Sequence, residues 1–155
     1  MAKQRRLDEL EFVAWRAFLY VYATVVPRLD QKMEREHGLT FSQFEVLTWI
    51  AVAGKQGVRM SDLASKVVLS PSGVTRAVDQ LERRGLVSRC VFEEDKRGQL
   101  ATITAEGRTA LRKATDSHVQ DLREHFVGHL SRAELECLGT SMRAVLSGEG
   151  TAFPG

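Results

Sequence analysis

The sequence has few of the residues that mark disulfide-rich proteins, metal sites or enzymes. Its two cysteines, Cys90 and Cys137, form no CxxC pair, so neither a disulfide framework nor a redox motif is expected. Both thiols are predicted to be buried and inert. His125 and His129 lie one helical turn apart, but no cysteine or acid cluster completes a tetrahedral metal site, and His118 is predicted to be a core residue. Nucleophile elbows, phosphate loops and catalytically spaced carboxylates are also absent, so we expect neither an enzyme nor a cofactor.

Long hydrophobic runs and a strong net charge are absent as well. No apolar run approaches the roughly 20 residues needed to cross a bilayer, and the basic start of the chain has no signal-peptide core behind it. We therefore expect a cytoplasmic protein that does not enter a membrane. Lysine and arginine exceed aspartate and glutamate by 22 to 20, so the net charge of +2 favours an anionic partner only faintly. With 155 residues, 43% of them hydrophobic, the chain suits one compact domain.

Residues 60–84 have the pattern of two short helices joined by a turn. Leu63 and Val67 are four residues apart, as on the buried face of a helix that Ser61 would cap. A second helix is predicted to begin at Ser70 and Pro71, because serine accepts from the free amides of a first turn and proline needs no partner there. The opposite face carries small and polar residues near its amino end, which is the end that a helix-turn-helix protein inserts into the major groove. The predicted buried face of this second helix comprises Val74, Ala77, Val78 and Leu81.

After Gly85, which is predicted to end the second helix, the sequence changes to strand formers. Residues 86–92 and 99–103 are predicted to pair as a hairpin, and residues 58–60 to add a third strand. A tight loop at residues 93–98 would join the two strands of the hairpin. Lys96 and Arg97 would then lie at its tip, where basic side chains can reach a phosphate backbone.

The segments SGVTRAVDQLERRGLV and ITAEGRTAL, with the wing triplet Asp95, Lys96 and Arg97, resemble the multiple-antibiotic-resistance regulator (MarR) family of winged-helix transcription factors. The resemblance implies a mainly α fold with a small β wing (α+β), in which a winged helix-turn-helix is carried on a helical dimerisation layer. It also implies that Arg97 enters the minor groove of double-stranded DNA and that Asp95 orients its guanidinium. Glu93 and Glu94, beside the wing tip, depart from the family pattern. The candidate DNA-binding residues are Ser70, Pro71, Ser72, Gly73, Thr75, Arg76, Gln80, Lys96 and Arg97.

The segments on either side of this motif are predicted to be helices with more apolar surface than one chain can cover. At 1.5 Å per residue, a helix over residues 7–35 would span about 43 Å, and Pro27 should kink or break it. Capping signals at Thr40 with Gln43, at Thr104, and at Ser131 predict the starts of three further helices. Residues 7–35 and 105–147 would form the dimerisation layer of a homodimer, residues 40–104 the DNA-binding lobe, and residues 148–155 a flexible tail.

Five aromatic residues fit two different roles. The family resemblance implies a pocket for a small aromatic effector between the dimerisation helices and the motif, whereas aromatic residues at helical spacing more often belong to a core. Both roles stay open at this point. The residues concerned are Trp15, Tyr20, Tyr22, Phe44 and Trp49.

Taken together, these patterns predict a homodimeric transcriptional regulator, a repressor that binds a palindromic operator and that a small molecule can release. Two alternatives stand beside it. A winged helix can serve as a protein-interaction module, which the weak net charge and the acidic flank of the wing favour. A thiol-switched, redox-sensing regulator that acts through Cys90 is the other.

Overall fold

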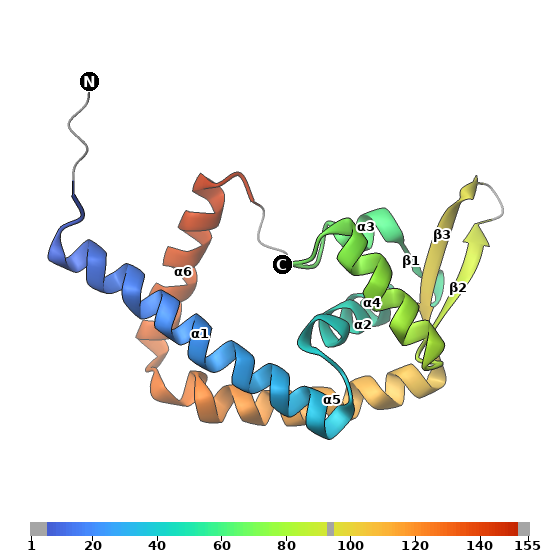
Figure 1. The fold of residues 1–155 in the computed structure, drawn as a ribbon, viewed down its shortest axis with the longest axis horizontal. Helices are drawn as coiled ribbons and strands as arrows, with labels where there is room; N and C mark the ends of the chain where they lie inside the picture. Colours follow the sequence, from blue (N-terminus) through green and yellow to red (C-terminus); the bar gives the residue numbers. More distant parts are fainter. Residues whose placement is uncertain (1–5, 93–94, 152–155) are drawn as a thin grey trace.

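The chain folds into a small winged lobe carried at one end of a layer of long helices (Figure 1). The computed structural model describes residues 6–92 and 95–151, and it describes no side chains for residues 91–99. Short 3₁₀ turns lie at Gly54–Gln56 and Val127–His129. The helices and strands are α1 (Glu9–His37), α2 (Phe41–Val52), β1 (Val58–Arg59), α3 (Met60–Ala64), α4 (Pro71–Arg83), β2 (Val87–Phe92), β3 (Asp95–Ile103), α5 (Ala105–His125) and α6 (Arg132–Gly148). This confirms the predicted mainly α fold with a small β wing.

Helix α1 begins and ends at clear local signals. The Asp8 carboxylate accepts from the Glu11 amide, and the Glu11 side chain accepts from the Asp8 amide, which makes a capping box. Gly38, with φ of 64°, ends the helix in the left-handed conformation. Of the kink or break expected at Pro27, the break was wrong, because α1 continues through this residue. A proline removes only one N–H donor, and the turns on either side of it keep their own hydrogen bonds.

The first half of α1 projects away from the lobe (Figure 1). Its apolar side chains are exposed. Leu10 is 79% exposed and Trp15 is 53% exposed. By length and composition alone, α1 is apolar enough to cross a membrane. The expectation that no segment could cross a bilayer was therefore too strong, because it rested on uninterrupted apolar runs alone. The stretch from residue 10 to residue 26 contains only two charged residues, Glu11 and Arg16.

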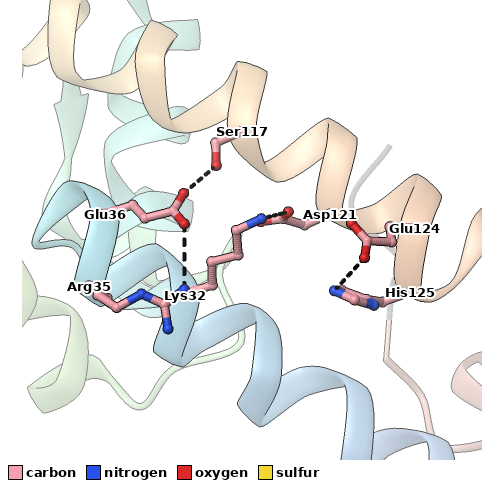
Figure 2. Close-up of polar contacts among 7 residues, drawn as sticks. All are labelled: Lys32, Arg35, Glu36, Ser117, Asp121, Glu124 and His125. Carbon is pink, nitrogen blue, oxygen red and sulfur yellow. Dashed lines mark hydrogen bonds and ion pairs between the residues drawn. The ribbon is translucent and has the colours of Figure 1, made fainter.

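The second half of α1 packs against α5, and polar contacts join the two helices (Figure 2). Lys32 forms an ion pair with Asp121, a carboxylate that is only 4% exposed. The hydrogen bond to Asp121 raises the pKa of Lys32, although partial burial opposes this shift. One turn further along α1, the Glu36 carboxylate accepts from the Ser117 hydroxyl at 3.1 Å. These contacts fix the end of α1 that leads into the lobe.

The core of the lobe lies between α2, α3, α4 and the sheet. Helix α2 starts at the predicted capping box, in which Thr40 accepts from the Gln43 amide and the Gln43 side chain accepts from the Thr40 amide. On α2, Phe44, Leu47 and Ile50 are buried, whereas Ala51 is partly exposed. The largest side chains with less than 2% exposure are Leu39, Val46, Leu47, Ile50, Leu63, Val74, Val78 and Leu81.

The three-stranded antiparallel sheet has the order β1-β3-β2, so the predicted third strand is confirmed. Val58 lies opposite Ala101, and Val87 lies opposite Ile103. The predicted loop at residues 93–98 was too long, since β3 already begins at Asp95. The charged residues Asp95, Lys96 and Arg97 have a low intrinsic preference for strands, which is why they were assigned to the loop. Backbone pairing in a two-stranded ribbon does not require apolar side chains, so they can still belong to β3. The register shifts between Val91 and Phe92, so the wing is irregular at this point.

Three further expectations were wrong. Ser61 lies inside the first turn of α3, because Arg59 takes the N-cap position. Cys90 and Cys137 are exposed, the first on β2 and the second on α6, whereas both thiols were expected to be buried. Helix α6 extends through Gly148, so the chain stays helical one residue beyond the predicted end of the dimerisation layer. For the two cysteines, the periodicity of a strand or helix defines its faces but does not tell which of them will be covered.

Candidate nucleic-acid interface

Helix α4 presents a capped amino end and a polar outer face, as the sequence predicts. The Ser70 hydroxyl accepts from the Gly73 amide at 3.1 Å, and Pro71 follows in the first turn. Val74, Ala77, Val78 and Leu81 are all buried against the rest of the lobe. The other face therefore points to solvent, and an exposed helix of this kind can approach the major groove of a duplex.

The outer face of α4 is polar, and near its amino end it carries a cation that no described acid pairs with. Ser72, Thr75 and Arg76 are exposed there, and within the described part of the chain the Arg76 guanidinium has no ion pair. The Thr75 hydroxyl donates to the Pro71 carbonyl at 3.1 Å, and the Ser70 and Ser72 hydroxyls lie 3.1 Å apart. These contacts hold the small side chains close to the helix, so Arg76 extends furthest toward a partner.

An ion-pair bridge that sequence reasoning missed links β2 to this helix. The Arg89 guanidinium lies 2.6 Å from the Asp79 carboxylate and 3.3 Å from the Glu82 carboxylate, and it donates to the Thr75 carbonyl at 3.4 Å. The only signal was a pair of acids three residues apart on α4, followed by an arginine in the next strand, which does not reveal a contact by itself.

Two more contacts join α4 to the corner between α1 and α2. The side-chain amide of Gln43 donates to the Gln80 carbonyl oxygen at 2.7 Å. Beyond the end of α4, the Arg84 guanidinium donates to the backbone carbonyls of His37 and Gly38. Helix α4 is therefore held at its middle by β2 and at its carboxyl end by α2 and the end of α1. Its amino end is left free for a partner.

Comparison with known proteins agrees with this arrangement. The model of the MarR family matches residues 37–98, which include α2, α3, α4 and β2. AbsC, a MarR family transcriptional regulator from Streptomyces coelicolor, is 30% identical over 96% of this chain and 100% of its own, with a TM-score of 0.88. The chain belongs to the MarR family.

A second relative of known structure from this family was solved with DNA. It is Sco3205 from Streptomyces coelicolor, which is 29% identical over 99% of this chain and 98% of its own, with a TM-score of 0.90. Among curated relatives, the regulator PrsX of Escherichia coli is 29% identical over 100 residues, and YdgJ of Bacillus subtilis is 32% identical over 106 residues. These alignments cover 64% and 68% of the chain but only 60% and 63% of the relatives, so the chain spans less than two thirds of the length of either.

The MarR-type wing is described only as backbone. Asp95, Lys96 and Arg97 belong to β3, and their side chains lie outside the described residues, as do Glu93 and Glu94 altogether. The expectation that Asp95 orients Arg97 therefore stays a prediction.

The five aromatic candidates for a MarR effector pocket do not come together within one chain. Trp15, Tyr20 and Tyr22 are exposed on the first half of α1, whereas Phe44 is buried in the lobe. Trp49 lies on α2 with the Lys66 ammonium 4.9 Å from the centre of its ring. A shared pocket of all five would need surface from a second subunit, so it stays a prediction.

His118 packs against aromatic rings, as expected of a core histidine. Its ring centroid lies 5.5 Å from that of Phe41 and 5.1 Å from that of Phe44. Burial lowers the pKa of His118, and the nearby Asp121 carboxylate opposes the shift. Among the residues that the structure describes, no three histidines, cysteines or acids lie close enough together to hold a metal ion.

Proposed function

We propose that this chain is a DNA-binding transcriptional repressor that binds a palindromic operator as a homodimer in the cytoplasm. The observation that carries the proposal is the free outer face of α4, where Ser70 caps the helix and Arg76 extends without a partner among the described residues. The likeness to Sco3205, which was solved in complex with DNA, supports it. Phosphate neutralisation would supply most of the affinity, and Arg76, Thr75 and Ser72 would make base or near-base contacts.

The exposed half of α1 supports the homodimer. Apolar side chains such as Leu10, Phe12 and Trp15 face solvent along this helix, and α6 (Arg132–Gly148) has no buried residue. A second copy of the chain is the simplest cover for such a surface. In a dimer of this kind, two copies of α4 would enter successive major grooves about 34 to 36 Å apart.

A small aromatic effector would act through the spacing of the two lobes. A ligand shifts an equilibrium only by the difference between its affinities for the two states. An effector that releases the repressor must therefore bind the free dimer more tightly than the DNA-bound dimer. Aromatic side chains exposed on α1, such as Trp15, would supply part of its pocket once a partner subunit covers them.

The contact surface is tested by Arg76→Ala. If Arg76 contacts a base, its loss should weaken specific binding by about 1–3 kcal/mol. Fluorescence anisotropy on a selected operator measures this, with Arg123→Ala on the exposed face of α5 as a control of equal charge change. Unchanged affinity in Arg76→Ala would remove the residue from the interface.

The wing is tested by the salt dependence of binding. Arg97→Ala should lower affinity for all duplex sequences and reduce the slope of log K against log salt by about one. The same titration on random duplex separates the repressor from a protein-interaction module, since the module would be indifferent to DNA. The acidic residues Glu93 and Glu94 beside the wing are the feature that favours the module.

A thiol-switched regulator is the second candidate, and the exposure of Cys90 on β2 favours it. Cys90 lies opposite Leu100 in the wing hairpin, and its thiol is 3.9 Å from the Leu100 carbonyl oxygen, so an oxidised and bulkier side chain there would disturb the wing. Peroxide should then weaken DNA binding of the wild type but not of Cys90→Ser. An equal response in both proteins would exclude this switch.

A further inference from the structure

We propose that Gln43, a nearly buried residue of α2, fixes the hydrogen-bonding polarity of Gln80 on α4. Gln80 then presents an N–H donor to the DNA, so that this position favours guanine and rejects cytosine. The inference rests on the proposed function, because it needs a duplex in front of α4. It concerns which base is read rather than whether DNA is bound.

The order of donors and acceptors follows from chemistry. A backbone amide can only donate, so the Gln43 atom 3.1 Å from the Thr40 amide must be the carbonyl oxygen Oε1. The other end of the Gln43 amide is then the donor Nε2, which lies 2.7 Å from Gln80. The Gln80 atom that receives it must be the acceptor Oε1. The Gln80 Nε2 is left as the outward group.

Burial keeps this chain of hydrogen bonds in one direction. Gln43 is only 8% exposed, so water can hardly replace a lost hydrogen bond there. If its side-chain amide turned over, its Nε2 would face the Thr40 N–H, which is also a donor, and its Oε1 would face the Gln80 Oε1, which is also an acceptor. The Gln43 side chain also belongs to the capping box that starts α2. Reversing it would lose the hydrogen bond from the Thr40 amide, and Gln80 would have to turn over as well to keep the other one. The capping box at the start of α2 therefore determines the orientation of the Gln80 amide.

The position of Gln80 is suited to reading a base. It is exposed, and it lies one helical turn after Arg76 on the same face. Both residues line one shallow hollow together with Gly73 of α4 and with Thr40 and Ser42 at the start of α2. Within the described part of the chain, the Gln80 Nε2 donates to no acceptor.

Each base presents its own pattern of donors and acceptors in the major groove, so a Gln80 that presents a donor should prefer some bases over others. A free glutamine reads adenine by donating to N7 and accepting from the N6 amino group. With Oε1 engaged by Gln43, Gln80 presents mainly its donor to the DNA. This donor matches the N7 and O6 acceptors of guanine best, and it can also meet the O4 of thymine or the N7 of adenine. Cytosine presents an amino donor there and is disfavoured. The preference is set through Gln43, a residue that is only 8% exposed.

Two substitutions should reverse the polarity. In Gln43→Glu the carboxylate still accepts from the Thr40 amide, since glutamate also serves at this capping-box position. Unlike the amide of Gln43, however, the carboxylate cannot donate to Gln80 and must accept a hydrogen bond from it. Gln80 would turn over and present its carbonyl oxygen. In Gln80→Glu the exposed carboxylate accepts from Gln43 and presents a second oxygen, so this variant tests the same point without altering the buried residue.

Selection of bound duplexes from a randomised pool, followed by anisotropy on single-base variants, measures the outcome. The base facing Gln80 should change from guanine to cytosine in both variants, with each preference about five-fold or more. Arg83→Gln, an exposed residue in the last turn of α4, is the control, because it makes the net charge more negative by one and leaves the pair intact. It should lower affinity with unchanged base preferences.

The outcomes separate this inference from the proposed function. If the wild type selects no sequence, the regulator itself is refuted. If the wild type selects a motif and both glutamate variants keep its base preferences at every position, Gln43 does not set the reading of Gln80 and the inference is overturned. If Gln43→Glu melts at a much lower temperature than the wild type, Gln80→Glu alone decides between these results.

Discussion

The bridge from Arg89 to helix α4 yields a prediction whose size follows from the structure. Arg89→Met removes the guanidinium and keeps an unbranched side chain of similar length, so the packing of the stem is largely retained. The Arg89 side chain is 18% exposed, while those of Asp79 and Glu82 are 36% and 40% exposed. Because both carboxylates reach water, each ion pair is partly screened and should contribute about 0.5–1 kcal/mol. The free energy of unfolding should therefore fall by about 1–2 kcal/mol.

A double-mutant cycle isolates the bridge from other effects of the substitution. Urea unfolding of Arg89→Met, Asp79→Asn and the double variant should give a coupling energy of about 0.5–1 kcal/mol. Arg83→Met, at an exposed position of the same helix, should change stability by less than about 0.5 kcal/mol. Operator affinity should fall in Arg89→Met as well, because α4 loses its fixed orientation relative to the wing. Additive effects of Arg89→Met and Asp79→Asn, with a coupling energy of zero, would refute this reasoning.

The remaining predictions concern pH and close packing. Burial lowers the pKa of His118 in the folded protein, so as the pH falls below about 6.5 the unfolded chain takes up the proton first and the free energy of unfolding decreases. In His118→Phe this decrease between pH 7 and pH 5 should be smaller. Equal decreases in wild type and variant, measured by urea titration, would contradict this. Gly107→Ala should destabilise by at least about 1–3 kcal/mol, because a Cβ there would lie 2.0 Å from the Leu86 carbonyl oxygen. Gly139→Ala on α6, where the nearest atom is 3.7 Å away, should instead stabilise by about 0.5–1 kcal/mol, and thermal unfolding compares the two. Ser70→Ala removes the cap of α4 and should reduce stability by about 1 kcal/mol, whereas equal melting temperatures of wild type and variant would show that the cap contributes nothing.

Features determined within a few residues were predicted well from the sequence. The capping boxes at Thr40 and Ser131, and the cap at Thr104, were placed correctly, because each pairs a side chain with an amide three residues later. The buried face of α4 was also correct in every position, since helical periodicity alone decides which side chains share a face.

Features that depend on distant partners could not be predicted in this way. The bridge from Arg89 to Asp79, and the contact of Gln43 with Gln80, join residues that become neighbours only after the sheet and helices pack. The exposure of Cys90 was missed for the same reason, because strand alternation gives two faces without saying which of them is covered. The MarR resemblance covered the lobe and gave no information on these particular pairs.

The close junction between α5 and the lobe would limit how the proposed effector controls this protein. Thr104 donates from its hydroxyl to the Gly85 carbonyl at 2.8 Å and from its amide to the Leu86 carbonyl at 3.1 Å, and Gly107 leaves no room for a side chain against Leu86. The central wing strand β3 continues through Thr104 directly into α5. The wing and α4 should therefore turn as one body whenever α5 turns. In the proposed repressor, a signal that reaches the long helices would then release both grooves of the duplex together.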